Sequence, residues 1–202
     1  MVLAVITRAE GETKRLPPRE RIVMAAADLF YRQGIRGVGV EAIARAARTN
    51  KMALYRHFAS KDELVAEWLR RLAVQSDEQW DEIGKTYQND PQGQLHAWIH
   101  LLATDISASD ERGCPFTNST AEILDKDHPA RLVIETYKMR HRDRIIHLCR
   151  RSKLHDPELV AEQLFLLMEG ARVSAQYLDT ARNPERLIRM AEALIGSPSE
   201  TD

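Results

Sequence analysis

Two short amphipathic segments separated by a polar turn lie between Val40 and Phe58, and this pattern is the strongest constraint on the fold. In the first segment the apolar residues recur at the spacing of one helical face: Val40, Ile43, Ala44 and Ala47. In the second, Leu54 and Phe58 lie four residues apart and can face the same core. The other side of the second segment is mostly polar, with Thr49, Asn50, Lys51, Tyr55 and Arg56. We therefore expect a buried inner helix and an outer helix rich in hydrogen-bond donors. A buried inner helix that supports a polar outer helix is the arrangement needed for insertion into the major groove of DNA.

The turn between the two segments is predicted at Ala47 to Asn50. Either Thr49 or Asn50 can cap the second helix, because a side-chain oxygen there accepts from its free amide groups. Downstream, Ser60 and Glu63 have the spacing of a capping box, so a long helix is expected to begin there.

An apolar stripe also predicts a helix over 19–33, which ends where Gly34 offers a left-handed stop. The run Leu-Tyr-Arg-His-Phe-x-x-Lys-x-x-Leu follows at 54–64. Together these segments resemble the amino-terminal domain of TetR-family transcriptional regulators over residues 19–66. The residues that carry the resemblance are Ala26, Phe30, Gly34, Ile43, Ala44, Ala47, Leu54, Tyr55, His57, Phe58, Lys61 and Leu64.

Two positions depart from the pattern of the family. Gly39 stands where a serine or threonine cap is usual, at a small cost because glycine is a tolerable cap. Arg48 stands where the turn usually has a glycine, and a non-glycine residue at a positive backbone angle is strained. Either the turn differs, or a phosphate contact made by Arg48 offsets the strain.

The charge distribution fits a nucleic-acid partner better than the net charge of −1 indicates. Residues 1–58 carry 11 Lys and Arg against 5 Asp and Glu, a net of +6, whereas residues 59–202 carry 18 against 25, a net of −7. A basic segment followed by an acidic one is typical of a protein that presents one end to phosphates. Two cysteines are too few for a disulfide framework and no secretory signal is evident, so a cytoplasmic location is expected.

The rest of the chain has helical rather than alternating periodicity, which predicts an all-α fold. Helices are expected over 95–106, 116–124, 130–151, 157–180 and 184–195. We predict a flexible arm (1–18), a three-helix DNA-binding head with a helix-turn-helix (19–62), a helical effector-binding and dimerisation body joined to it by the long helix (63–196), and a tail (197–202).

The helix predicted over 157–180 is apolar on more than one side, which indicates a second buried face. The resemblance implies that the last two helices form a four-helix interface in a homodimer. The candidate residues are Leu167, Gly170, Ala171, Ser174, Leu187, Met190, Ala191 and Leu194. The alternative is that this helix is simply central within one subunit.

The resemblance also implies which residues meet double-stranded DNA. The residues expected in the major groove are Thr49, Asn50, Lys51, Met52 and Tyr55, and those expected at phosphates or the groove edge are Arg48, Arg56, His57 and Lys61. Asn50 is a candidate for reading adenine and Met52 for contacting a thymine methyl.

A small-molecule effector inside the body is a further implication of the resemblance. The candidate wall residues are Trp98, Leu102, Phe116, Ile123, Tyr137, Met168 and Tyr177. Most are apolar or aromatic, which favours a largely apolar ligand, although for any single residue ordinary core packing is the favoured interpretation. The predicted function is a ligand-responsive transcriptional repressor that binds a palindromic operator as a dimer.

Two alternatives remain: a DNA-binding dimer without an effector, and a helical enzyme. His96 and His100 lie one helical turn apart, a spacing that can present two imidazoles to one ion, and Cys114 is a conceivable nucleophile. No nucleophile, base and orienting group are recognisable together. Neither an enzyme activity nor a cofactor nor a metal site is therefore predicted.

Overall fold

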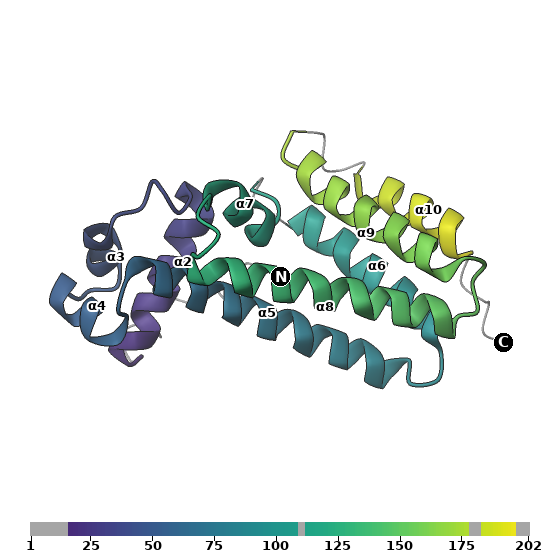
Figure 1. The fold of residues 1–202 in the computed structure, drawn as a ribbon, viewed down its shortest axis with the longest axis horizontal. Coiled ribbons are helices and arrows are strands. Elements are labelled where there is room, and N and C mark those ends of the chain that lie inside the picture. Colours follow the sequence, from purple (N-terminus) through teal and green to yellow (C-terminus); the bar gives the residue numbers. More distant parts are fainter. Residues whose placement is uncertain (1–15, 109–111, 178–182, 197–202) are drawn as a thin grey trace. The chain divides into compact units, whose positions relative to one another are not determined.

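The computed structural model of the chain describes residues 16–108, 112–177 and 183–196. Within these ranges there are nine α-helices and no strand, as expected for an all-α fold (Figure 1). The helices are α2 (Pro18–Gln33), α3 (Val40–Ala46), α4 (Lys51–His57), α5 (Lys61–Thr86), α6 (Pro91–Ala108), α7 (Pro115–Glu122), α8 (Pro129–Arg151), α9 (Pro157–Ser174) and α10 (Asn183–Ile195). Among the described helices, none combines the length and apolar composition needed to cross a bilayer.

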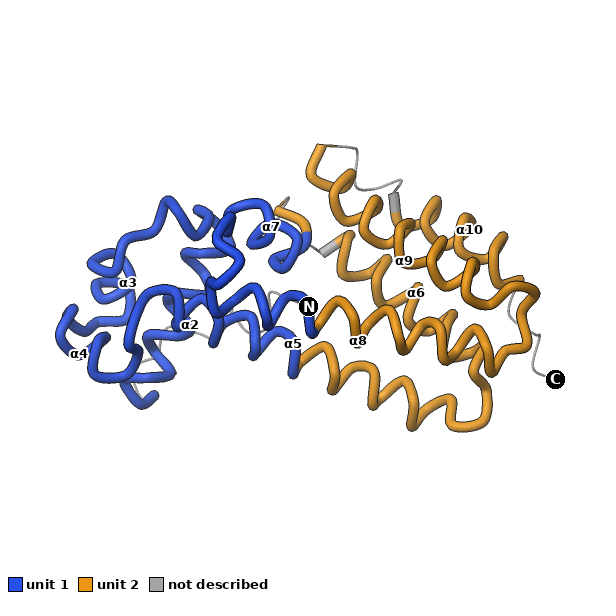
Figure 2. Tube along the Cα trace, viewed as in Figure 1, with its two compact units in different colours: residues 1–74, 114–136 blue, residues 75–113, 137–202 orange. Residues whose placement is uncertain are grey.

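The chain divides into two compact units, each discontinuous in sequence (Figure 2). Unit 1 contains residues 1–74 and 114–136, and unit 2 contains residues 75–113 and 137–202. The predicted boundary between 62 and 63 lies inside unit 1, which also holds residues 63–74 and 114–136. Most of the predicted arm and the whole predicted tail lie outside the described residues.

The core of unit 1 forms around α2. Its buried residues follow one helical face: Ile22, Val23, Ala26, Ala27, Phe30 and Tyr31. The ring of Phe30 lies 5.7 Å from that of Trp68 in α5. The helix ends at Gly34, whose φ of 79° and ψ of 158° lie in a region that is essentially restricted to glycine.

Polar contacts tie α7 and the α7–α8 turn to the rest of unit 1. The Glu122 carboxylate accepts a hydrogen bond from the backbone N–H of Arg36 at 2.9 Å. The Nε2 of His128 lies 3.3 Å from an Asp62 carboxylate oxygen, while its Nδ1 accepts from the N–H of Ala130. These pairs explain why a segment remote in sequence belongs to this unit.

Unit 2 is organised around α6, which packs mainly against α10 and also against α9. Leu95, Ile99 and Leu164 are at most 2% exposed there. The predicted helix over 157–180 ends earlier, at Ser174, because the last turn tightens: Gln176 and Tyr177 donate to carbonyls three residues back.

Candidate nucleic-acid interface and ligand cavity

Helices α3 and α4 form the helix-turn-helix that the sequence pattern predicts. On α3, Ile43 and Ala44 are 0% and 4% exposed, and on α4 Leu54 is 0% exposed. Phe58 follows α4 directly and is also buried. Since the apolar side of each helix is used for packing, the opposite side of α4 is left to solvent.

The turn between these helices is a Schellman motif, a hydrogen-bonded helix ending that places one residue in the left-handed region. The N–H of Thr49 donates to the carbonyl of Ala44 at 2.9 Å, and the N–H of Arg48 donates to that of Arg45 at 3.0 Å. Arg48 has a φ of 52°. The arginine therefore occupies the position where glycine is favoured, and the turn itself keeps the expected geometry. The Nε of Arg21, which the sequence pattern did not identify, donates to the carbonyl of Ala47 at 3.1 Å.

Replacing Arg48 with glycine should raise the free energy of unfolding by about 1 kcal/mol, because glycine adopts a positive φ without steric cost. Lys153 is a matched control, since it holds the same position of a second Schellman motif after α8 with a φ of 55°. Chemical denaturation should show a similar gain for Lys153→Gly. If Arg48 contacts phosphate, only Arg48→Gly will also weaken DNA binding. A gain at Lys153 with none at Arg48 would contradict the assignment of strain to Arg48.

Asn50 is the N-cap of α4, and its Oδ1 accepts from the N–H of Ala53 at 2.8 Å. Reading adenine through both amide atoms needs the same oxygen as an acceptor from the base. Asn50 therefore has a structural role, and its Oδ1 would have to accept a second hydrogen bond to read adenine as well.

All nine residues predicted to meet DNA are accessible to solvent. Thr49 and Lys61 are partly exposed, and the others are exposed: Arg48, Asn50, Lys51, Met52, Tyr55, Arg56 and His57. Met52 is 79% exposed and Tyr55 is 44% exposed, so this face presents two large apolar side chains to solvent.

Lys51 forms an exposed ion pair with Glu41 of α3, with 2.7 Å between Nζ and Oε1. The hydrogen bond from Lys51 lowers the pKa of the Glu41 carboxyl and raises the pKa of the lysine. A DNA phosphate that binds Lys51 must therefore compete with Glu41.

The predicted capping box at the start of α5 is half formed. Ser60 Oγ accepts from the N–H of Glu63 at 3.0 Å, as predicted. The Glu63 carboxylate instead accepts from both terminal nitrogens of Arg70 at 3.0 Å. Arg70, seven residues further along α5, is therefore the partner of Glu63 in place of the backbone N–H of Ser60.

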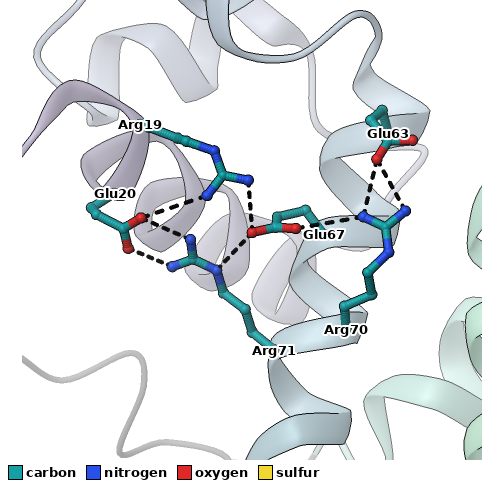
Figure 3. Close-up of polar contacts among 6 residues, drawn as sticks. All are labelled: Arg19, Glu20, Glu63, Glu67, Arg70 and Arg71. Carbon is teal, nitrogen blue, oxygen red and sulfur yellow. Dashed lines mark hydrogen bonds and ion pairs between the residues drawn. The ribbon is translucent and has the colours of Figure 1, made fainter.

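A charged network joins the first turn of α2 to α5 (Figure 3). Glu67 lies between Arg19 and Arg71, at 2.9 and 3.1 Å. Arg71 also donates to both carboxylate oxygens of Glu20, at 2.6 and 2.8 Å. A hydrogen bond from Arg71 lowers the pKa of Glu20 below its ordinary value of 4.5. Burial would raise the pKa of Glu67, but hydrogen bonds from the two arginines lower it overall.

Replacing Glu67 with glutamine should lower the free energy of unfolding at pH 7 by about 1 kcal/mol, the upper end for accessible ion pairs. A carboxyl whose folded-state pKa is depressed stabilises the protein above its ordinary pKa of 4.5 and loses that effect as the pH falls through the folded-state value. The difference between wild type and variant, measured by denaturation at several pH values, should therefore shrink below about pH 4.5. Glu63→Gln removes the exposed pair with Arg70 and leaves the contacts of Glu67 with Arg19 and Arg71 in place, so it should change stability less; an equal loss would contradict the network.

Unit 2 contains a cavity with about 280 Å³ of empty space, part of it open to solvent. Its walls come from four helices and are Ser76, Gln79 and Trp80 of α5, Trp98, Leu101, Leu102 and Asp105 of α6, His141 of α8 and Arg172 of α9. Of the predicted wall residues, the cavity brings together Trp98 and Leu102. The sequence analysis missed Trp80, His141 and Arg172.

The other predicted wall residues lie elsewhere. Tyr137 packs beside His141, with 5.7 Å between ring centroids, and Met168 is buried in the core of unit 2. Phe116 and Ile123 are buried and belong to unit 1. Tyr177 is 73% exposed. Helical periodicity finds apolar faces but not the element that each face meets, so these residues were not distinguished from core.

The predicted dimerisation residues divide into two groups. Ala171, Leu187 and Ala191 are at most 7% exposed and are part of the core of unit 2. Gly170 and Met190 are exposed, and the remaining three are partly exposed: Leu167, Ser174 and Leu194. The buried three already have packing partners within unit 2, which leaves the accessible five as candidates for contact with a second copy.

The residues considered for metal or enzyme chemistry do not come together. His96 is buried and His100 is exposed, although they share α6. Among the described residues, no group of three His, Cys, Asp or Glu side chains is arranged to hold a metal ion. Both cysteines are buried, and burial raises the pKa of the Cys149 thiol to about 11, so it is not poised as a thiolate nucleophile.

Comparison with known proteins gives consistent matches. The family described as bacterial regulatory proteins, tetR family, matches residues 22–68. A TetR-family transcriptional regulator from Streptomyces coelicolor has a similar structure, with a TM-score of 0.83, 25% sequence identity and coverage of 88% of this chain and 94% of that chain. A TetR-type transcriptional regulator from Streptomyces avermitilis has a TM-score of 0.69 and 30% identity, with coverage of 88% and 99%. The similarity therefore extends well beyond the residues that the family pattern matches.

Proposed function

The chain belongs to the TetR family and is a DNA-binding transcriptional regulator, and from this premise we propose that it acts as a dimeric repressor that a small molecule releases from a palindromic operator. The structures that it resembles are named as transcriptional regulators, which favours a protein that is not an enzyme.

The observation that carries the proposed mode of DNA reading is the division of α4 into a buried and an exposed side. Leu54 and Ala53 pack inward at 0% and 6% exposure, while Met52 and Tyr55 lie open beside basic residues. Exposed apolar side chains next to cations suit a surface that meets both base edges and phosphates. Thymine methyl groups are apolar partners in the major groove, and lysine and arginine neutralise the phosphates beside it.

The proposed dimer rests on an apolar stripe along α9. Leu159, Leu166 and Val173 recur every seven residues and are 53%, 62% and 41% exposed. A β-carbon added to Gly170 would meet nothing within 4 Å, so another helix can approach closely there. An apolar stripe of this length is characteristic of helix association, and a second copy would bury it by twofold symmetry. Two copies would then present two α4 helices to the half-sites of a palindrome.

Selection of bound duplexes from random DNA by the full-length protein tests the proposal. We expect a palindrome whose half-sites lie about one helical turn apart, and an affinity that falls steeply with salt. Enrichment of a single half-site would contradict the dimer, and no enrichment would contradict sequence-specific DNA binding. Leu166→Glu, on the exposed stripe, should abolish the palindrome preference and yield a monomer in sedimentation, whereas Leu132→Glu, at 71% exposure on α8, should not.

A further inference from the structure

Helix α4 is too short to keep a fixed direction by itself, so the contacts at its two ends decide its orientation. It has seven residues, whereas isolated helices shorter than about 12 residues are marginal in water. Asn50 caps its start, and Phe58 closes its end with an N–H that donates to the carbonyl of Leu54 at 3.0 Å. Phe58 is 3% exposed, so the residue that ends α4 is anchored inside unit 1.

Arg19 of α2 lies over the ring of Phe58. Its Cζ is 5.1 Å from the ring centroid, within the roughly 6 Å range of a cation–π contact. A guanidinium is planar, so it can face a ring and still donate hydrogen bonds along its edge. The Nη2 of Arg19 donates to Glu67 of α5 at 2.9 Å. One side chain therefore connects the end of α4 to α5.

The neighbours of Arg19 hold its guanidinium in place (Figure 3). Glu67 also accepts from Nε of Arg71 at 3.1 Å, and Arg71 donates to both carboxylate oxygens of Glu20. The Glu20 carboxylate in turn lies 3.6 Å from Nη1 of Arg19, which closes a ring of four side chains. The charges of two arginines and two glutamates cancel, so Arg19 is not left as an unpaired cation for a phosphate.

We propose that Arg19 is a positioning residue for DNA reading, which fixes the end of α4 through the ring of Phe58 while Glu67 fixes Arg19. The inference deepens the proposed function and rests on it, because α4 is the helix that meets the base edges in that proposal. Contacts to bases need side chains within about 0.5 Å of the productive geometry, whereas attraction to phosphates tolerates small shifts. Loss of the Phe58 contact should therefore weaken sequence preference more than overall affinity for DNA.

Arg19→Lys tests this role, because lysine keeps the charge but lacks the planar group that can face a ring and donate along its edge. Fluorescence anisotropy on the full-length protein gives the ratio of its affinities for the selected operator and for unrelated DNA. The ratio should fall by about fivefold or more, the smallest effect expected when one base contact is lost. A loss of stability alone would reduce the folded fraction equally for both DNAs and leave the ratio unchanged.

Arg70→Lys is the matched control, because the partners of Arg70 in the described part of the chain, Glu63 and Glu67, both lie on α5. Its ratio should equal that of the wild type. Phe58→Leu removes the ring, so Arg19→Lys should change the ratio less in that background. An unchanged ratio in Arg19→Lys would overturn the proposal, as would an equal fall in Arg70→Lys or an equal effect of Arg19→Lys with and without the ring.

A direct contact between Arg19 and a phosphate predicts a different result. Arg19→Gln removes the charge, and the loss of a phosphate contact would reduce the slope of log affinity against log salt on unrelated DNA by about 0.9 for each bound copy. A positioning role leaves that slope unchanged, so a reduced slope would overturn the proposal.

Hydrogen exchange decides the question if Phe58→Leu fails to fold. The N–H of Gly34 is a reference, because it ends α2 with the same kind of bond, to the carbonyl of Phe30 at 3.0 Å. In Arg19→Lys the N–H of Phe58 should exchange faster by about threefold or more, relative to that of Gly34. Equal acceleration of the two would overturn the proposal.

The wild-type protein separates this inference from the proposed function. If it selects an operator and Arg19→Lys keeps the full affinity ratio, the proposed function stands and this inference fails. If it selects no operator, the proposed function fails and Arg19 has no DNA reading to support, while hydrogen exchange still shows whether Arg19 holds the end of α4.

Discussion

Replacing Gly34 with alanine should lower the free energy of unfolding by about 3 kcal/mol, because its backbone conformation is essentially restricted to glycine. At a φ of 79° and ψ of 158°, any β-carbon is strained whatever space surrounds it. The added β-carbon would also lie 2.9 Å from a carboxylate oxygen of Glu122. Relieving that overlap requires the carboxylate to move from the N–H of Arg36. Urea denaturation of the purified variant measures the loss.

Two comparisons identify the source of this loss. Gly84→Ala changes a glycine inside α5 that has nothing within 4 Å of the added β-carbon, so it should stabilise by about 0.5–1 kcal/mol. Glu122→Ala removes the overlapping carboxylate. If overlap contributes, the double variant of Gly34 and Glu122 will be less destabilised than the sum of the two single changes. A Gly34→Ala protein as stable as wild type would show that the loop does not adopt this conformation.

The parts of the fold that the sequence predicts are those set by neighbours along the chain. The starts of α4 and α5 follow from side-chain caps, because Asn50 and Ser60 each accept from a backbone N–H three residues later. The strained position of Arg48 was also predictable, because the Schellman turn depends on six consecutive residues.

Contacts between distant segments were not predictable in this way. Glu122 reaches a loop 86 residues earlier, and Trp80 and His141 are separated by 61 residues. The cavity depends on the rotation of four helices about their axes, which a hydrophobic pattern restricts only to a broad face. The same ambiguity applies to Leu187 and Ala191: an apolar stripe indicates burial, and both the subunit core and a second copy could provide it.

Replacing Lys51 with alanine should weaken binding to all DNA sequences and reduce the slope of log affinity against log salt by about 0.9 for each bound copy of the chain, or nearly 2 for the proposed dimer. The reason is that each phosphate contact releases condensed counterions on binding. Lys61→Ala should act in the same way if Lys61 contacts phosphate. Lys85→Ala, which removes an equal charge from the exposed end of α5 in unit 2, should leave the slope unchanged.

The structure also identifies a substitution that should strengthen DNA binding, because the Glu41 carboxylate lies 2.7 Å from the Nζ of Lys51 in the free protein. Glu41→Gln removes this competitor and a negative charge near the phosphates, so affinity should rise severalfold on operator and unrelated DNA alike. The gain in affinity from Glu41→Gln should be smaller in the Lys51→Ala background, because that variant has no lysine for Glu41 to pair with. Fluorescence anisotropy over a salt series measures all four proteins. A gain of equal size with and without Lys51 would show that Glu41 acts through its charge alone, and an unchanged slope in Lys51→Ala would remove this lysine from the interface.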